Sequence, residues 1–140
     1  MIPNNTIKAA IVAETQLVPT LTGTVLPDGA KGVAEINWRG DEFHYPNVRI
    51  GDISQTDQTP DSNCTPVIID WSVYVFSEVH SSLQADEIAG LIVVYFKDRN
   101  FTSNGLKFVR VGILENIAAI QEDSNTWRAQ IRCRSIVYTV

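Results

Sequence analysis

The sequence predicts an α+β fold, in which two helices pack on one face of an antiparallel (mixed) sheet and the chain ends in a long C-terminal β-hairpin. Apolar residues recur at helical spacing in 7–18 and in 81–96, whereas apolar and polar residues largely alternate in 67–76 and in 127–140. Elements in this order favour helices gathered on one side of a sheet. With 140 residues and a hydrophobic content of 44%, we expect one domain, 1–140.

The first expected element is a helix that begins at Thr6, because a threonine hydroxyl can accept a hydrogen bond from an amide of the first turn. Ile7, Ile11 and Val18 lie on or near one side of this helix. We expect Pro19 to end it, since a proline ring clashes with the preceding turn and supplies no amide donor.

Glycine, proline and polar residues punctuate the segment between the two helices. Short strands are predicted at 22–26, 33–38 and 45–50, and Pro46 restricts the last of these to an edge or a first position. Residues 51–66 are rich in Asp, Ser, Thr, Gln and Pro. A polar stretch of this length predicts a flexible loop within the domain.

The strongest strand pattern covers 67–76. One face is expected to hold Ile69, Trp71, Val73 and Val75, and the other Asp70, Ser72, Tyr74 and Phe76. Because both faces carry large side chains, the pattern favours a central strand or one that contacts another subunit.

A second helix is predicted over 81–96. Ser81 followed by Gln84 resembles a capping box, and acidic residues in the next turn suit the positive end of the helix dipole. Gly90 is unfavourable in mid-helix, so we expect it to be compensated by a close approach to the sheet. The expected apolar stripe comprises Leu83, Ile88, Leu91, Ile92, Tyr95 and Phe96.

The last third of the chain predicts turns and long strands. Asn104-Gly105 and 123–125 are turn signals. Residues 106–111 are predicted to form a strand, and the context favours a strand for 113–121, although its alanines permit a helix. In the final strand, 127–140, the expected apolar face holds Trp127, Ala129, Ile131 and Cys133, and the polar face holds Arg128, Gln130, Arg132 and Arg134.

The charge of the chain argues against one broad class of function. Sixteen acidic and eleven basic side chains give a net charge of −5, which disfavours a general nucleic-acid binder. Residues 1–96 carry four basic and twelve acidic side chains, whereas 97–140 carry seven and four. Such separation can give a molecule two electrostatic faces, unless folding mixes the halves.

The chain lacks the residue patterns of common active sites and metal sites. His44 and His80 have no second ligand at metal-site spacing, and Asp52, Asp57 and Asp61 do not match a calcium loop. There is no glycine-rich phosphate loop and no nucleophile elbow. We therefore expect no enzymatic activity, no metal and no cofactor.

The number of cysteines and the hydropathy of the sequence predict where in the cell the protein is found. Two cysteines, Cys64 and Cys133, do not form a disulfide framework, and we interpret Cys64 as an incidental thiol. The longest apolar run, 91–96, is too short to span a membrane, and no signal peptide is visible. We expect an intracellular, reduced protein with no membrane partner.

The most informative pattern for function is a ladder of three arginines, Arg128, Arg132 and Arg134, on one face of the final strand. Three neighbouring cations need acids, phosphate or water around them. The alternatives are a solvated sheet face, salt bridges to an acidic neighbouring subunit, and a wall that faces a polyanion. The candidate subunit-interface or lumen residues are Arg128, Arg132, Arg134, Tyr74, Phe76 and Asp70.

The order of these patterns resembles that of a known family. A short helix leads to the strand Tyr45-Pro46-Asn47-Val48-Arg49-Ile50, and then come the strong strand 68–75 and a helix with an acidic start. Glu122-Asp123 then turns into the Trp127-Arg128 strand. Over nearly the whole chain this is similar to the tail terminator (tail completion) proteins of long-tailed bacteriophages.

The resemblance implies a structural virion protein that forms a hexameric ring at the tail–neck junction. Such a ring caps the tail tube, ends its polymerisation and joins the tail to the head or neck connector, after assembly in the host cytoplasm. DNA passes through the lumen without specific binding. Asp52, Asp57 and Asp61 in the 51–66 loop are the candidate partner-contact residues.

Two other interpretations stay open. A neck or head-completion connector protein has a similar size and also forms rings. A small α+β module that binds a ligand or a nucleic acid is the alternative from another class.

Overall fold

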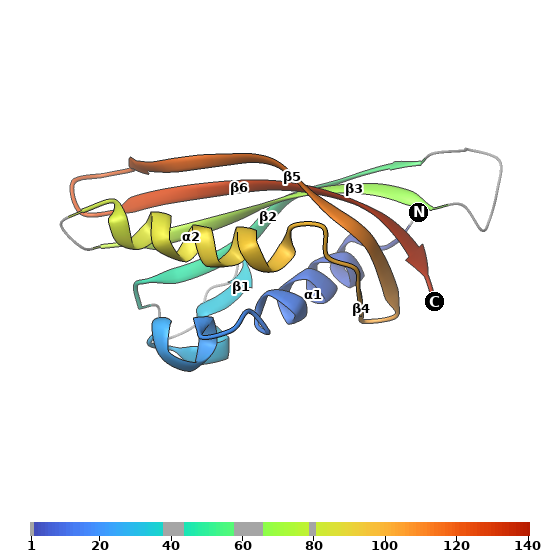
Figure 1. Cartoon of the computed structure of the whole chain (residues 1–140), viewed down its shortest axis with the longest axis horizontal. Helices are drawn as coiled ribbons and strands as arrows, with labels where there is room; N and C mark the ends of the chain where they lie inside the picture. Colours follow the sequence, from blue (N-terminus) through green and yellow to red (C-terminus); the bar gives the residue numbers. More distant parts are fainter. Residues whose placement is uncertain (1, 38–43, 58–65, 79–80) are drawn as a thin grey trace.

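A computed structural model places six strands in one curled sheet, with both α-helices on the same side of it (Figure 1). It describes residues 2–37, 44–57, 66–78 and 81–140. This arrangement confirms the predicted α+β class and the long C-terminal hairpin. The elements are α1 (Asn4–Thr15), a π-helical turn (Leu21–Val25), a 3-10 turn (Gly29–Gly32), β1 (Val33–Glu35), β2 (Asn47–Asp57), β3 (Val67–Ser77), α2 (Leu83–Phe96), β4 (Phe101–Ser103), β5 (Leu106–Gln121) and β6 (Trp127–Thr139).

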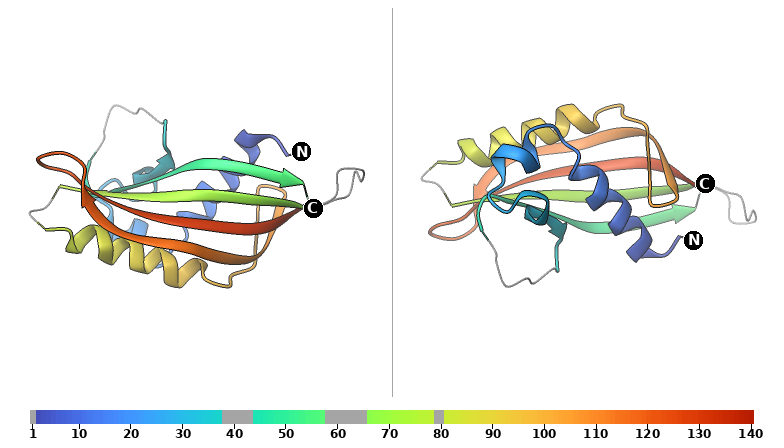
Figure 2. Two further views of the ribbon diagram at one scale, coloured as in Figure 1. Left: turned by 90° about the horizontal axis from the view of Figure 1, so that it is seen from above. Right: turned by 90° about the horizontal axis from the view of Figure 1, so that it is seen from below.

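The strand order is β1-β2-β3-β6-β5-β4, in which β1 runs parallel to β2 and every other neighbouring pair is antiparallel. The two segments with the clearest alternation, β3 and β6, therefore lie side by side in the middle of the sheet (Figure 2). They pair without interruption from Val67 with Val137 to Ser77 with Trp127. The expectation of a central strand at 67–76 is confirmed.

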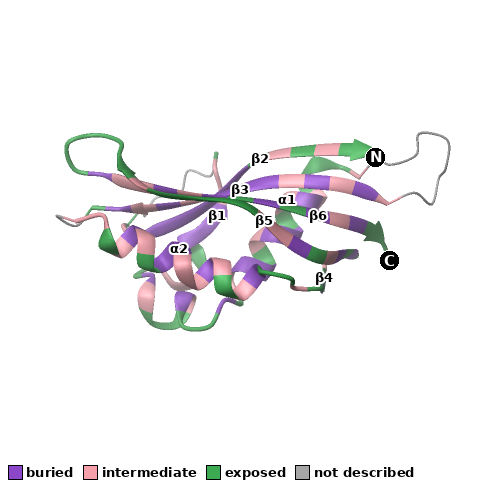
Figure 3. Ribbon diagram, turned by 45° about the horizontal axis from the view of Figure 1, so that its top comes forward, coloured by how far each residue is buried: buried purple, intermediate pink, exposed green. Residues whose placement is uncertain are grey.

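Alternate residues of β3 and β6 form the sheet side of the hydrophobic core, and the two helices cover it (Figure 3). The Trp71 ring meets Phe108 edge-on, with the ring centroids 6.0 Å apart, a favourable aromatic geometry. The buried hydrophobic residues of the two strands on this face are Val67, Ile69, Trp71, Val73, Val75, Ala129, Ile131, Cys133 and Val137.

The N-terminal segment differs from its prediction in three places. The first helix ends at Thr15, before the expected stop at Pro19. Thr6 is not the N-cap, because α1 begins at Asn4 and the Pro3 carbonyl accepts from the amides of Thr6 and Ile7. The strand predicted at 22–26 is wrong. There the hydroxyl of Thr24 donates to the Thr20 carbonyl, and such local bonds favour turns over strands.

The predicted loop 51–66 is wrong for its first half, because β2 continues to Asp57 and pairs with the start of β3. The chain keeps this pairing by a β-bulge between Gly51 and Ser54, where Asp52 adopts a left-handed φ of 55°. Polar side chains are compatible with a strand here because most of them face solvent. Residues 58–65 lie outside the described part of the chain.

The predicted helix 81–96 is present as α2, Leu83–Phe96, but three of its details are wrong. Gln84 does not close a capping box, since its Oε1 accepts a 2.6 Å hydrogen bond from the Ser77 hydroxyl. Gly90 does not approach the sheet, because a Cβ placed there would meet no atom within 4 Å. Leu83, which was assigned to the apolar stripe, is 73% exposed.

The C-terminal third matches its prediction closely. Asn104 and Gly105 both have positive φ, as a two-residue hairpin turn requires. β5 extends to Gln121, which confirms the strand expected at 113–121. In the next turn the Asp123 carboxylate accepts hydrogen bonds from the amides of Asn125 and Thr126 at 2.8 and 2.9 Å, and these bonds lower the pKa of Asp123.

Candidate assembly surface

The face of the sheet that points away from the helices carries the arginine ladder. In the described part of the chain this face has no helix over it, as the left view of Figure 2 shows. We call it the open face. The register brings together on it the predicted residues Asp70, Tyr74, Phe76, Arg128, Arg132 and Arg134.

Each arginine of the ladder is paired with an acid of the same chain. Arg134 forms a two-pronged pair with Asp70, with Nε–Oδ1 and Nη2–Oδ2 distances of 2.7 and 3.0 Å. Arg132 and Arg128 each place Nη1 at 3.1 Å from a carboxylate oxygen, of Glu115 and Glu122 respectively. The pair with Asp70 raises the pKa of Arg134.

These pairs largely neutralise the charge of the arginine ladder on the open face. Their side chains are partly exposed, and exposed ion pairs contribute roughly 0–1 kcal/mol each to stability. The ladder is therefore available for contact with another molecule at small energetic cost to the fold.

An aromatic pair lies beside the ladder. The rings of Tyr74 and Phe76 stack with centroids 6.3 Å apart, and the Arg128 guanidinium lies 5.5 Å from the Tyr74 ring centroid. The Tyr74 hydroxyl donates to the Asp52 carboxylate. Burial first, and then this hydrogen bond, raise the pKa of Tyr74. Tyrosine, phenylalanine and arginine are enriched in protein interfaces.

A polar hollow of about 350 Å³ lies between these groups. Gln130 crosses it, with Nε2 at 3.2 Å from the Ser72 hydroxyl and 3.3 Å from the Tyr74 hydroxyl. Asp52, which was predicted as a loop residue for partner contacts, lines the hollow from β2. The remaining lining residues include Ser54, Asp70, Glu115, Ile117 and Arg132.

The other two partner-contact candidates are not part of this cluster. Asp57 is exposed at the end of β2, opposite Val67 and far along the sheet from the aromatic pair. Asp61 lies outside the described residues. Glu115 and Glu122, which complete the ion pairs, were missed by the sequence prediction. Glu122 lies next to the predicted 123–125 turn, whereas Glu115 is placed opposite Arg132 by irregularities in the pairing of β5 with β6.

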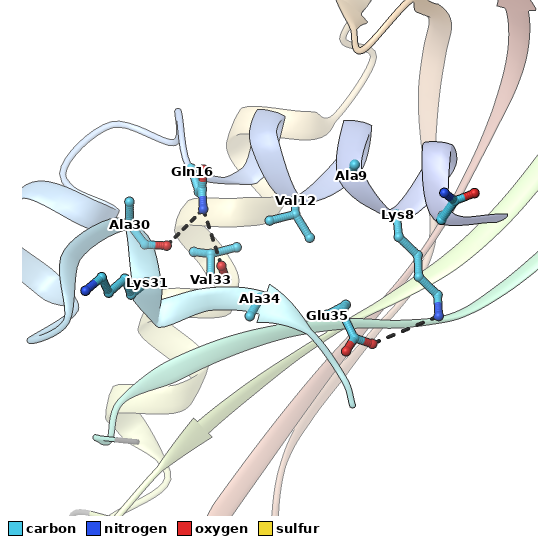
Figure 4. Close-up of a pocket in the computed structure, with 10 residues that line it drawn as sticks. Lys8, Ala9, Val12, Gln16, Ala30, Lys31, Val33, Ala34 and Glu35 are labelled. Carbon is cyan, nitrogen blue, oxygen red and sulfur yellow. Dashed lines mark hydrogen bonds and ion pairs between the residues drawn. The ribbon is translucent and has the colours of Figure 1, made fainter. Parts of the chain in front are cut away.

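An apolar groove of about 500 Å³ separates α1 from β1 on the helix side of the sheet (Figure 4). The Gln16 side chain donates to the carbonyls of Ala30 and Val33 at 2.9 and 3.4 Å, and Lys8 lies 4.0 Å from Glu35. These polar groups are already engaged with the groove's own walls. The groove therefore offers apolar contact more than directed bonds to a ligand.

His44 is engaged in a hydrogen bond, and Cys133 is inaccessible to solvent. His44 Nδ1 lies 2.7 Å from Asp28 Oδ1, and hydrogen bonding from His44 lowers the pKa of Asp28. Cys133 is buried, which raises the pKa of its thiol to about 12. Within the described ranges, no cluster of three or more His, Cys, Asp or Glu side chains could hold a metal ion.

His80 and Cys64 fall outside the described residues. Within these residues, no helix has the length and apolar character needed to cross a membrane.

No known family model matches the sequence, and no curated protein matches it. Among solved structures, the chain is similar to one in the virion of a native gene transfer agent particle. The similarity covers 94% of each chain with a TM-score of 0.75, at 15% sequence identity. At this identity the similarity shows a common fold over nearly the whole chain.

Proposed function

We propose that this chain is a structural virion protein that forms a ring at the end of a tail tube. The observation that carries the proposal is the fold that it shares, over 94% of both chains, with a chain of a virion particle. The resemblance of its sequence patterns to tail terminator proteins supports the same role. In this role the protein caps the tube, ends its polymerisation, and joins the tail to the head or neck connector.

The open face supports assembly into a ring. Tyr74, Phe76 and Arg128 offer a stacked, partly exposed contact surface of the kind found in interfaces. In the proposed ring, which has six copies by the resemblance, this face lies against a neighbouring copy or lines the lumen. Asp52 and Asp57 are proposed contacts for the tube or connector protein.

Passage of DNA through the lumen fits the charge of the ladder. Affinity for DNA depends on cations that neutralise phosphates and release counterions. Arg128, Arg132 and Arg134 are already neutralised by acids of their own chain. A lumen lined by such pairs would let a polyanion slide without specific binding.

The test is to add the purified protein to tail-tube protein during polymerisation and to image the products by electron microscopy. The proposal predicts shorter tubes with added density at one end. Tubes of unchanged length without a cap would contradict the terminator role.

A neck or head-completion protein is the second candidate, since it would be part of the same kind of particle. It predicts binding to the head connector in a pull-down and no effect on tube length. The same two experiments therefore separate the candidates.

A further inference from the structure

The second half of α2 is apolar all round, yet one side of it is uncovered. Residues 91–96 are all aliphatic or aromatic. Ile92 and Phe96 are buried in the core, whereas Val94 on the opposite side is 81% exposed. A helix that is apolar on every side is typically buried on every side. The isolated chain therefore leaves this surface without its partner.

The uncovered side of α2 borders a hollow of about 620 Å³, which we call the α2 hollow. Gly90 leaves space there, because a Cβ at this position would meet no atom within 4 Å. Because glycine has no side chain, Gly90 leaves part of the α2 hollow unfilled. The hollow is lined by Val18, Pro19, Glu87, Gly90, Leu91, Val94, Tyr95 and Arg99.

A second apolar segment is partly exposed beside the N-terminal part of α2, where the Ala119 amide donates a 2.8 Å hydrogen bond to the Asp86 carboxylate of the same chain. β4 pairs only with Leu106–Phe108 of β5, so residues 112–121, the hairpin arm, form an edge without a second strand in the described part of the chain. Leu114, Ile117 and Ile120 are exposed along it. Natural proteins usually protect such apolar edges with charges, prolines or a covering element.

We propose that the hairpin arm of one copy docks into the α2 hollow of the next copy, an inference that rests on the proposed ring. Both surfaces are apolar and uncovered, one protrudes and the other is hollowed, and they belong to different parts of the chain. A contact between two different patches is heterologous, and it can be repeated around a closed ring.

The distribution of charge supports docking of the hairpin arm into the α2 hollow, and it gives the orientation of the arm along α2. Lys97, Arg99 and Arg110 surround the C-terminal end of α2, with Asp98 and Glu14 as partial counterions. The turn at the tip of the hairpin arm carries the acidic Asp123, next to Glu122, which already pairs with Arg128 of its own chain. The acidic turn therefore points toward the end of α2.

This direction places Ile120 near Val94. Ile120 lies two strand residues, about 7 Å, before Glu122, and Val94 lies three helical residues, about 4.5 Å, before Lys97. In the proposed contact, both apolar side chains therefore lie on the same side of the charged residues, within about one to two residues of each other along the interface.

The direct test is a disulfide between neighbouring copies, made in the full chain with Cys64→Ser. Val94→Cys and Ile120→Cys are combined, since a disulfide forms only when Cβ atoms approach to about 3.5–4.5 Å. The buried thiol of Cys133 is left in place. We expect a ladder of covalent multimers on a non-reducing gel, and no ladder from the matched control, Leu83→Cys with Ile120→Cys.

The outcome separates this inference from the proposed function. An oligomer by light scattering that gives no Val94–Ile120 ladder would overturn the docking and leave the ring intact. A protein that stays monomeric would contradict the ring itself, and the docking with it.

A second variant tests the hollow without cysteines. Gly90→Leu fills the space, and it should weaken association at least about tenfold, as loss of an interface anchor does, while the monomer stays folded by circular dichroism. Leu83→Gln changes an exposed apolar residue of the same helix outside the hollow, and it should leave association unchanged. Equal association of Gly90→Leu and the wild type would contradict the proposal.

Discussion

The two sides of the sheet hold ion pairs in different ways. On the helix side, Glu14 is almost fully buried, and it accepts hydrogen bonds from Arg99 Nε at 2.9 Å and from the Tyr95 hydroxyl at 2.8 Å. On the open face, Arg134 and Asp70 form a pair of similar length, but both side chains are partly exposed. An arginine–carboxylate pair is therefore partly buried in the fold on the helix side, whereas on the open face it is exposed to solvent.

This difference in burial indicates where substitutions are tolerated. A buried carboxylate that loses its partner keeps its desolvation cost, whereas an exposed one returns to water. We infer that the helix side determines stability and that the open face can be altered for association with little effect on folding.

The largest expected effect is on the aromatic residues of β3. Trp71→Ala should lower the free energy of unfolding by about 3–5 kcal/mol, because it leaves a cavity in the core. Tyr74→Ala, three residues further on the open face, should lower it by roughly 1–2 kcal/mol. Urea unfolding at fixed protein concentration measures both, and equal losses would contradict the assigned roles of the two faces.

A buried and an exposed ion pair should differ in the same way in their contribution to stability. Glu14→Gln removes a buried charge that Arg99 and Tyr95 both contact, and it should cost about 1–3 kcal/mol. Asp70→Asn removes the partner of an exposed arginine and should cost no more than about 1 kcal/mol. Thermal unfolding of the two variants is a direct check, and the account fails if Asp70→Asn is the more damaging.

Charge reversal on the ladder should change association rather than stability. If Arg132 faces a neighbouring copy, Arg132→Glu should weaken association about tenfold, or about 1.4 kcal/mol. The control is Arg132→Glu with Glu115→Arg, which restores the pair within the chain. Recovery of association by this swap would show that only the internal pair matters, whereas unchanged association of Arg132→Glu would favour the lumen.

The smallest expected effect is pH-dependent. The pKa of Asp123 is lowered from 3.8 in the folded chain by its hydrogen bonds to the turn amides. Its contribution to stability is therefore complete above 3.8, and it is lost as the pH falls through the lowered value. Asp123→Asn keeps an acceptor but cannot titrate, so its melting temperature should fall less between about pH 5 and pH 2.5 than that of the wild type. Identical pH profiles would contradict this assignment.

The helix side of the sheet could be predicted from sequence because alternation places residues on faces directly. Trp71 and Ile131 were assigned to the apolar side of their strands, and both are buried. The predicted ladder residues likewise share one face, since a strand has a period of two.

The partners of the ladder could not be predicted, because they depend on register. Gln121 pairs with Trp127, and an uninterrupted ladder from there would set Asn116 opposite Arg132. Irregularities along β5 shift the pairing so that Glu115 takes that place.

The polar composition of 51–57 favours a loop, and local propensity does not indicate the strand that forms there. This polar stretch is a strand because β3 supplies its backbone partners and the Gln55 amide binds the backbone of Ile2. Both contacts are distant in sequence.

The mass of the protein in solution shows whether the chain forms a ring. Size exclusion with light scattering should give one species at a whole-number multiple of 15.5 kDa, six by the resemblance to tail terminators. The mass should fall in Gly90→Leu and stay constant in Leu83→Gln. A mass of 15.5 kDa at every concentration, unchanged by addition of tail-tube protein, would contradict the account.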